Sequence, residues 1–170
     1  AVLRVAPTTG ERIALVSSSA GGVELPDDVL VVGTDELRAG RRAWIHDELL
    51  GRRWRISGES FFQTRTDGAE ALASTVAGML DGVLGDGRGG TLVDAYCGVG
   101  LFTGALLPGR DGWRAVAAER GRSSVADAKV NLADLDARVV STSIERFRAP
   151  RARVVVADPS RTGLGKDAVR

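Results

Sequence analysis

Cysteine, histidine, methionine and lysine are scarce in this chain of 170 residues. Cys97 is the single cysteine, and only two of the 23 basic residues are lysines. One cysteine excludes an internal disulfide and any zinc or iron–sulfur site built on several cysteines. Apolar runs are only a few residues long, far short of the roughly 20 that a membrane-spanning helix needs, and no signal peptide opens the chain. We therefore expect a cytoplasmic protein that binds neither a metal nor a membrane.

What the chain does contain is typical of a globular domain. Hydrophobic residues make up 44% and charged residues 26%, with a net charge of +1. The remaining 21 basic residues are arginines. Arginine binds phosphates and stacks on bases, although a coding bias toward arginine, alanine and glycine is the better explanation of its abundance. Because the chain starts at Ala1 and ends at Arg170 inside an unfinished strand–helix unit, we expect a piece of a longer protein.

The first 58 residues predict a small β-rich lobe. A Pro-Thr-Thr-Gly turn at 7–10 and a Glu-Leu-Leu-Gly turn at 48–51 each separate two strand-like segments, which is typical of hairpins. The expected strands are 2–5, 12–16, 29–32, 42–46 and 53–57.

Residues 59–170 predict a second domain of class α/β. Its helix at 67–84 has apolar residues three and four apart and resembles a capping box at Asp67 and Glu70. Strands at 91–95, 114–118, 138–140 and 153–157 alternate with helices at 101–107 and 123–135, so we expect a Rossmann-like parallel sheet. The continuous apolar run 154–156 predicts a strand that is covered on both faces.

A glycine-rich turn joins the first strand of this sheet to a helix. Asp94 ends the strand, and Gly98 and Gly100 let the backbone approach a ligand closely. A dinucleotide site needs a third glycine where Thr103 stands, and an acid before the turn repels a pyrophosphate. The turn fits a cationic, amino-acid-bearing ligand such as S-adenosylmethionine better.

Two further positions test that interpretation. Glu119 ends the next strand, 21 residues after Gly98, where a carboxylate can accept hydrogen bonds from both hydroxyls of a ribose; alone, it is equally a solvated strand-end residue. A phosphate-binding loop around Lys166 is excluded, because the motif needs glycine in place of Ser160 and a hydroxyl in place of Asp167.

Four segments together resemble one family. They are Ser60–Gln63 (Ser-Phe-Phe-Gln), the turn from Asp94 to Phe102, Glu119, and Asp158–Gly163 (Asp-Pro-Ser-Arg-Thr-Gly). In order and spacing they are similar to the RNA uracil-C5 methyltransferases, over about residues 55–169. The resemblance implies a class I methyltransferase fold and transfer of a methyl group from S-adenosylmethionine to uracil C5 in tRNA or ribosomal RNA.

The resemblance also implies the site residues. The expected cofactor contacts are Gln63 at the methionine or sulfonium end, Tyr96 in the turn wall, Glu119 at the ribose and Asp158 near the methyl group, together with Asp94, Gly98 and Gly100. Arg161 is expected to face the RNA. Two positions depart from the family, namely Leu101, which replaces an asparagine of some members, and Ser143, which replaces an Asn or Asp near the adenine.

The family's reaction needs a cysteine thiolate that adds to uracil C6. Cys97 lies inside the glycine turn, so we interpret it as a packed residue and expect the nucleophile beyond residue 170. The chain alone is then inactive. The strand at 153–157 would expose an apolar edge, which predicts poor solubility or contact with another chain.

Other interpretations stay open. A methyltransferase of small molecules or proteins would share the glycine turn and Glu119, and an RNA-binding module could keep the fold without catalysis. Phe61 is expected in the core and His46 on an exposed strand face without a partner. Arginines 38, 41, 42, 52, 53 and 55 surround Trp44 and Trp54 and fit either single-stranded RNA or a solvated hairpin face.

Overall fold

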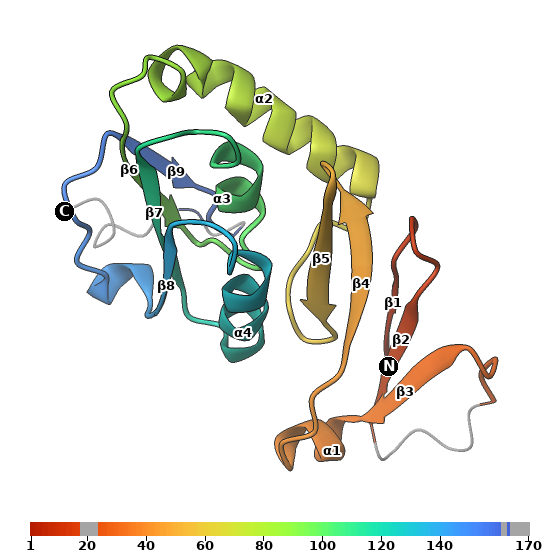
Figure 1. Ribbon diagram of the computed structural model, residues 1–170. Helices are drawn as coiled ribbons and strands as arrows, with labels where there is room; N and C mark the ends of the chain where they lie inside the picture. Colours follow the sequence, from red (N-terminus) through yellow and green to blue (C-terminus); the bar gives the residue numbers. More distant parts are fainter. Residues whose placement is uncertain (18–23, 161–162, 164–170) are drawn as a thin grey trace.

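A computed structural model describes residues 1–17, 24–160 and 163 (Figure 1). The strands are β1 (Val2–Val5), β2 (Arg12–Val16), β3 (Val29–Gly33), β4 (Trp44–Leu49), β5 (Arg52–Ser57), β6 (Gly90–Ala95), β7 (Trp113–Glu119), β8 (Ala137–Ser141) and β9 (Val154–Ala157). The helices are α1 (Thr34–Arg38), α2 (Thr66–Leu84), α3 (Leu101–Leu106), α4 (Arg122–Asn131) and the 3₁₀ turn η1 (Ile144–Arg146). Sequence periodicity did not predict α1 and η1, which are only five and three residues long.

The N-terminal part contains two small sheets. β1 and β2 form the expected antiparallel hairpin, and β3 adds to β2 in parallel. β4 and β5 form the second hairpin, but β4 continues to Leu49, so the turn is only Leu50-Gly51. Both turn residues have positive φ, 55° and 66°, as a two-residue hairpin turn requires. The expected four-residue turn is therefore wrong.

The C-terminal part is an all-parallel sheet of order β8-β7-β6-β9, as expected for the α/β class. The side chains of Leu92, Ala115 and Val154 share one face and pack against residues of α2 and α3. Ala117 continues this face and packs against α4. Figure 1 shows these three helices on the same side of the sheet. In the described part no α-helix lies on the other face.

Three expectations for this part are wrong. Val155 is 63% exposed, so β9 is covered on one face only. α4 ends at Asn131, four residues early, because turns follow it. α2 begins without a side-chain cap: Asp67 pairs with Arg65, and Glu70 accepts a hydrogen bond from the N–H of Leu50 in the hairpin turn.

The β4–β5 hairpin packs directly against the parallel-sheet part. The Trp54 ring is fully buried and packs on Gly104 of α3, where an added Cβ would lie 2.5 Å from Cη2. One apolar cluster joins residues of β2 and β5 to Phe62, Ala69 and Leu101. A boundary near residue 58 stays a prediction, but the core is continuous across it. Within the described ranges, no helix is long and apolar enough to cross a membrane.

Candidate functional site

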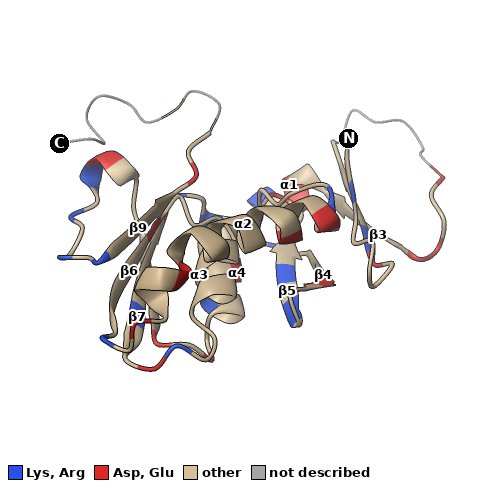
Figure 2. Ribbon diagram, turned by 90° about the horizontal axis from the view of Figure 1, so that it is seen from above, with Lys and Arg blue, Asp and Glu red and all other residues tan. Residues whose placement is uncertain are grey.

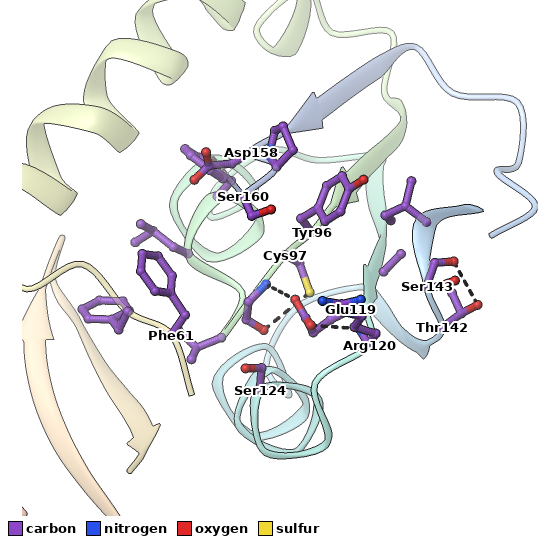
Figure 3. A pocket seen from close by; sticks show the side chains of 18 of the residues that line it. Phe61, Tyr96, Cys97, Glu119, Arg120, Ser124, Thr142, Ser143, Asp158 and Ser160 are labelled. Carbon is purple, nitrogen blue, oxygen red and sulfur yellow. Dashed lines mark hydrogen bonds between the residues drawn. The ribbon is translucent and has the colours of Figure 1, made fainter. Parts of the chain in front are cut away.

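A cavity of about 700 Å³ lies at the carboxyl ends of the parallel strands (Figure 3). The chain runs from β6 outward to β7 and β8 and then returns to add β9 on the other side of β6. Such a reversal leaves a crevice beyond the strand ends, which is where ligands bind in open α/β sheets. Residues at or just after the carboxyl ends of all four strands line the cavity, including Tyr96, Glu119, Thr142 and Asp158.

The glycine turn forms one wall of the cavity. Tyr96 and Gly98 line it and both have positive φ, 63° and 55°. Such a backbone is uncommon for a tyrosine and supports the predicted role of Tyr96 at the site, although the sequence pattern could not reveal its positive φ. A Cβ on Gly98 would meet only the carbonyl oxygen of Phe61, at 3.9 Å, so the turn leaves open space for a ligand. Gly100, in contrast, does not line the cavity: it packs on Leu132 with φ 96°.

Asp94 lies beneath the turn rather than on the cavity wall. Its fully buried Oδ2 accepts hydrogen bonds from the backbone N–H (3.0 Å) and the hydroxyl (2.7 Å) of Thr103, which holds the start of α3. Burial raises the pKa of Asp94 to about 6. Oδ1 is buried without a hydrogen-bond partner in the described structure. The sequence predicts that Asp94 contacts the ligand directly, but its carboxylate lies beneath the turn and holds the start of α3 instead.

Glu119 shapes the turn and faces the cavity. Its Oε2 accepts a hydrogen bond from Gly98 N–H (3.1 Å), and its Oε1 accepts from the N–H groups of Arg120 (2.8 Å) and Gly121 (2.7 Å), as Figure 3 shows in part. A carboxylate held by three backbone donors has a fixed orientation, and Oε2, which has a single donor, retains room for a further one. Glu119 can therefore accept a hydrogen bond from a ligand's hydroxyl.

The charges around the cavity are mainly negative. Among the described residues its wall includes three carboxylates, Glu119, Glu145 and Asp158, against one cation, Arg120. This surplus opposes a pyrophosphate and suits a neutral or cationic ligand. In the described ranges no group of three or more His, Cys, Asp or Glu side chains could hold a metal ion.

Residues 61–63 form another part of the wall, next to Gly98 of the glycine turn. Phe62 is buried in the core, Gln63 lies half-buried at the cavity, and Phe61 is 70% exposed at its rim. The expectation that Phe61 is a core residue is wrong, because Phe62, the next residue, takes the buried position and leaves Phe61 at the rim. The structure thus brings the predicted residues Gln63, Tyr96, Gly98, Glu119 and Asp158 to one cavity. Arg161 lies outside the described residues.

Cys97 is a packed residue, as interpreted from the sequence. It is buried against Ala117, Ala128 and Leu132. Burial strongly raises the pKa of its thiol. A thiol in this state is a poor nucleophile, because only the thiolate attacks.

The arginine-rich hairpin is occupied largely by contacts within the chain. Trp54 is buried. The Cζ atom of Arg55 lies 4.0 Å from the centre of the Trp44 ring, and its Nε donates a hydrogen bond to Asp127. Arg52 pairs with Asp134. Figure 2 shows basic residues on β5. Contact of this cluster with RNA stays a prediction, although Trp54 itself is closed to base stacking.

His46 differs from its expected setting. It is half-buried on β4, and its Nδ1 lies 3.3 Å from a carboxylate oxygen of Glu11. The expectation of an exposed side chain without a partner is wrong, because the β1–β2 turn brings Glu11 to β4.

Comparison with known proteins gives consistent relatives, although no family model matches the chain. An RNA methyltransferase of Streptomyces avermitilis is 32% identical over 96% of this chain. The tRNA (uracil-5-)-methyltransferase homolog B of Danio rerio is 37% identical over 74% of it. The chain spans only 38% and 27% of the lengths of these relatives.

A solved structure has the same fold. The tRNA (uracil-54, C5)-methyltransferase of Pyrococcus abyssi, in complex with S-adenosyl-L-homocysteine, superposes on 98% of this chain with a TM-score of 0.74 and 21% identity, and the match covers 45% of that protein. The expected class I methyltransferase fold is confirmed. Over most of its length the chain is thus similar to RNA methyltransferases, among them a tRNA (uracil-5-)-methyltransferase homolog, in agreement with the resemblance that its motifs predicted.

Proposed function

We propose that this chain binds S-adenosylmethionine and belongs to an enzyme that methylates uracil C5 in tRNA or ribosomal RNA. The observation that carries the proposal is the cavity at the chain reversal, where an open glycine turn and an oriented carboxylate, Glu119, face a mostly acidic wall. The names of the relatives supply the RNA substrate.

The residues present fit this cofactor. Glu119 would accept a hydrogen bond from a ribose hydroxyl through Oε2, and Gly98 would allow the nucleoside to lie against the turn. Asp158 and Gln63 would border the methionine end, where a carboxylate favours the positive sulfonium. The bound cofactor supplies an electrophilic methyl group; the chain's own part is to bind, orient and shield it.

The nucleophile is not Cys97. Covalent activation of uracil needs a thiolate against the ring, whereas this thiol is buried under the turn with a raised pKa. We propose that another part of the enzyme, outside these 170 residues, supplies that thiol, and that the chain alone binds the cofactor without methylating uracil.

RNA is the partner we propose, with Arg161 facing it. A second chain across the edge of the described sheet at β9, and a cytoplasmic location, stay predictions. A methyltransferase acting on a small molecule or a protein is disfavoured by the relatives' names but shares the same cavity. Salt dependence separates them, because phosphate contacts release counterions and make RNA affinity fall steeply with salt.

The experiment is calorimetric titration of the chain with S-adenosylhomocysteine and, separately, with NAD. Binding of the first and not the second supports the proposal. Binding of NAD alone, or of neither, contradicts it. Filter binding of a uridine-containing RNA between 50 and 200 mM salt then tests the partner.

A further inference from the structure

The cavity wall at residues 61–63 has little backbone support of its own. It lies between β5 and α2, outside any strand or helix. The segment follows Ser60, which is almost fully buried. The position of residues 61–63 therefore depends on the contacts that fix Ser60.

One buried carboxylate holds the hydroxyl of Ser60. Asp127 of α4 is fully buried, and its Oδ2 accepts hydrogen bonds from Ser60 Oγ (2.6 Å) and Ser57 N–H (2.7 Å). Its Oδ1 accepts from Ser57 Oγ (2.8 Å) and Arg55 Nε (2.9 Å). A buried carboxylate with four donors is well satisfied and has one preferred geometry.

The carbonyl of Ser60 is held from another direction. The guanidinium of Arg4 on β1 donates to this oxygen. Arg4 is partly buried, its Nε has no partner in the described structure, and burial lowers its pKa. Burial of a charged guanidinium is costly unless it is hydrogen-bonded. The bond from Arg4 to the Ser60 carbonyl is such a contact. Strand β1 and helix α4 thus meet at Ser60.

We infer that Asp127, acting through the Ser60 hydroxyl, is a positioning residue for the cavity wall formed by Phe61, Phe62 and Gln63. Arg4 is the second tether of the same wall and links it to the N-terminal sheet. The affinity test of this inference rests on the proposed function, since it uses S-adenosylhomocysteine as the probe.

The chain offers a matched pair of variants. Ser60→Ala and Ser57→Ala each remove one hydroxyl donor from the same carboxylate. Ser57 lies in β5, whose backbone is held by pairing with β4, whereas Ser60 lies in the unsupported segment. A structural role alone would affect both variants alike; a positioning role affects only Ser60→Ala.

Three measurements are made on the whole 170-residue chain: unfolding free energy, amide hydrogen exchange of residues 61–63, and calorimetric affinity for S-adenosylhomocysteine. In Ser60→Ala we expect faster exchange at 61–63 and an affinity lower by up to about tenfold, because only part of the stabilisation from the lost charge-assisted hydrogen bond acts on the cavity wall. In Ser57→Ala we expect native exchange there and an affinity within about twofold of wild type, despite a similar loss of stability. If Ser60→Ala fails to fold, Arg4→Met, which removes the other tether, is expected to give the same two effects.

Two results overturn the inference. One is native exchange at 61–63 in the folded Ser60→Ala variant. The other is an equal effect of both serine variants on exchange and affinity. Failure of the wild-type chain to bind S-adenosylhomocysteine refutes the proposed function instead, and the exchange comparison then decides the inference alone.

Discussion

Replacement of Glu119 by glutamine tests the centre of the site. The carboxylate receives three backbone N–H groups, one on Oε2 and two on Oε1. In Glu119→Gln the single remaining oxygen best serves the two donors of Arg120 and Gly121, so the new NH₂ group faces the N–H of Gly98. Two donors then oppose each other, and the acceptor for a ribose hydroxyl on that side is lost.

The expected magnitude follows from those contacts. Hydrogen bonds to a charged group contribute about 1.5–3 kcal/mol, so the affinity for S-adenosylhomocysteine should fall roughly 10- to 150-fold. Stability should fall as well, by about 1–2 kcal/mol, because the turn loses one of its supports. Calorimetric titration and urea denaturation measure the two effects.

The matched control is Glu145→Gln. Glu145 lines the same cavity, but it lies on η1, away from the glycine turn. This variant removes the same charge and should change the affinity by less than about threefold, because exposed charges are screened. Equal losses in both variants would mean that the cavity's general field, not the Glu119 hydrogen bonds, binds the ligand, and the reasoning above would be refuted.

Three further predictions concern stability and reactivity. Gly104→Ala should lower the unfolding free energy by about 1–3 kcal/mol in urea denaturation, because the new Cβ meets the buried Trp54 ring. Gly78→Ala, in open space on α2, should instead raise it by up to about 1 kcal/mol in the same assay. Asp94 has a folded-state pKa raised to about 6, so between pH 4 and pH 6 the folded state binds a proton that the unfolded state has released. The unfolding free energy of the wild type, relative to that of Asp94→Asn, should therefore fall by up to about 3 kcal/mol from pH 4 to pH 7. A constant difference in unfolding free energy between the two proteins over this pH range would contradict the prediction. Cys97→Ala should retain cofactor binding, and the wild-type thiol should react slowly with iodoacetamide in the native state; loss of binding, or rapid alkylation, would contradict its packed role.

Local patterns predicted most of the architecture. Strand and helix periodicity located the parallel sheet and both hairpins, because each depends on residues close in sequence. The glycine turn was recognisable, since positive φ at Gly98 and Gly100 has few alternatives to glycine. The sequence also predicted that Glu119 and Asp158 lie at one edge of the sheet, because the carboxyl ends of parallel strands meet there.

Long-range contacts account for what the sequence could not predict. Which of Phe61 and Phe62 enters the core depends on how the segment leaves β5. The buried role of Asp127 was hidden because its four donors lie 67 to 72 residues away, and a polar residue in an amphipathic helix normally indicates the solvated face. The positive φ of Tyr96 has no sequence signal at all.

The abundance of arginine takes on a definite meaning once the contacts are known. Arginines join separate elements at several places: Arg55 and Arg52 bind carboxylates of α4 and of the turn after it, and Arg153 binds Asp86 before β6. A planar guanidinium suits such links because it makes paired hydrogen bonds to a carboxylate. The described cavity wall, by contrast, includes a single arginine, Arg120. Basic residues thus hold the scaffold together while acidic residues gather at the strand ends, and this separation allows an arginine-rich chain to present a site suited to a cation.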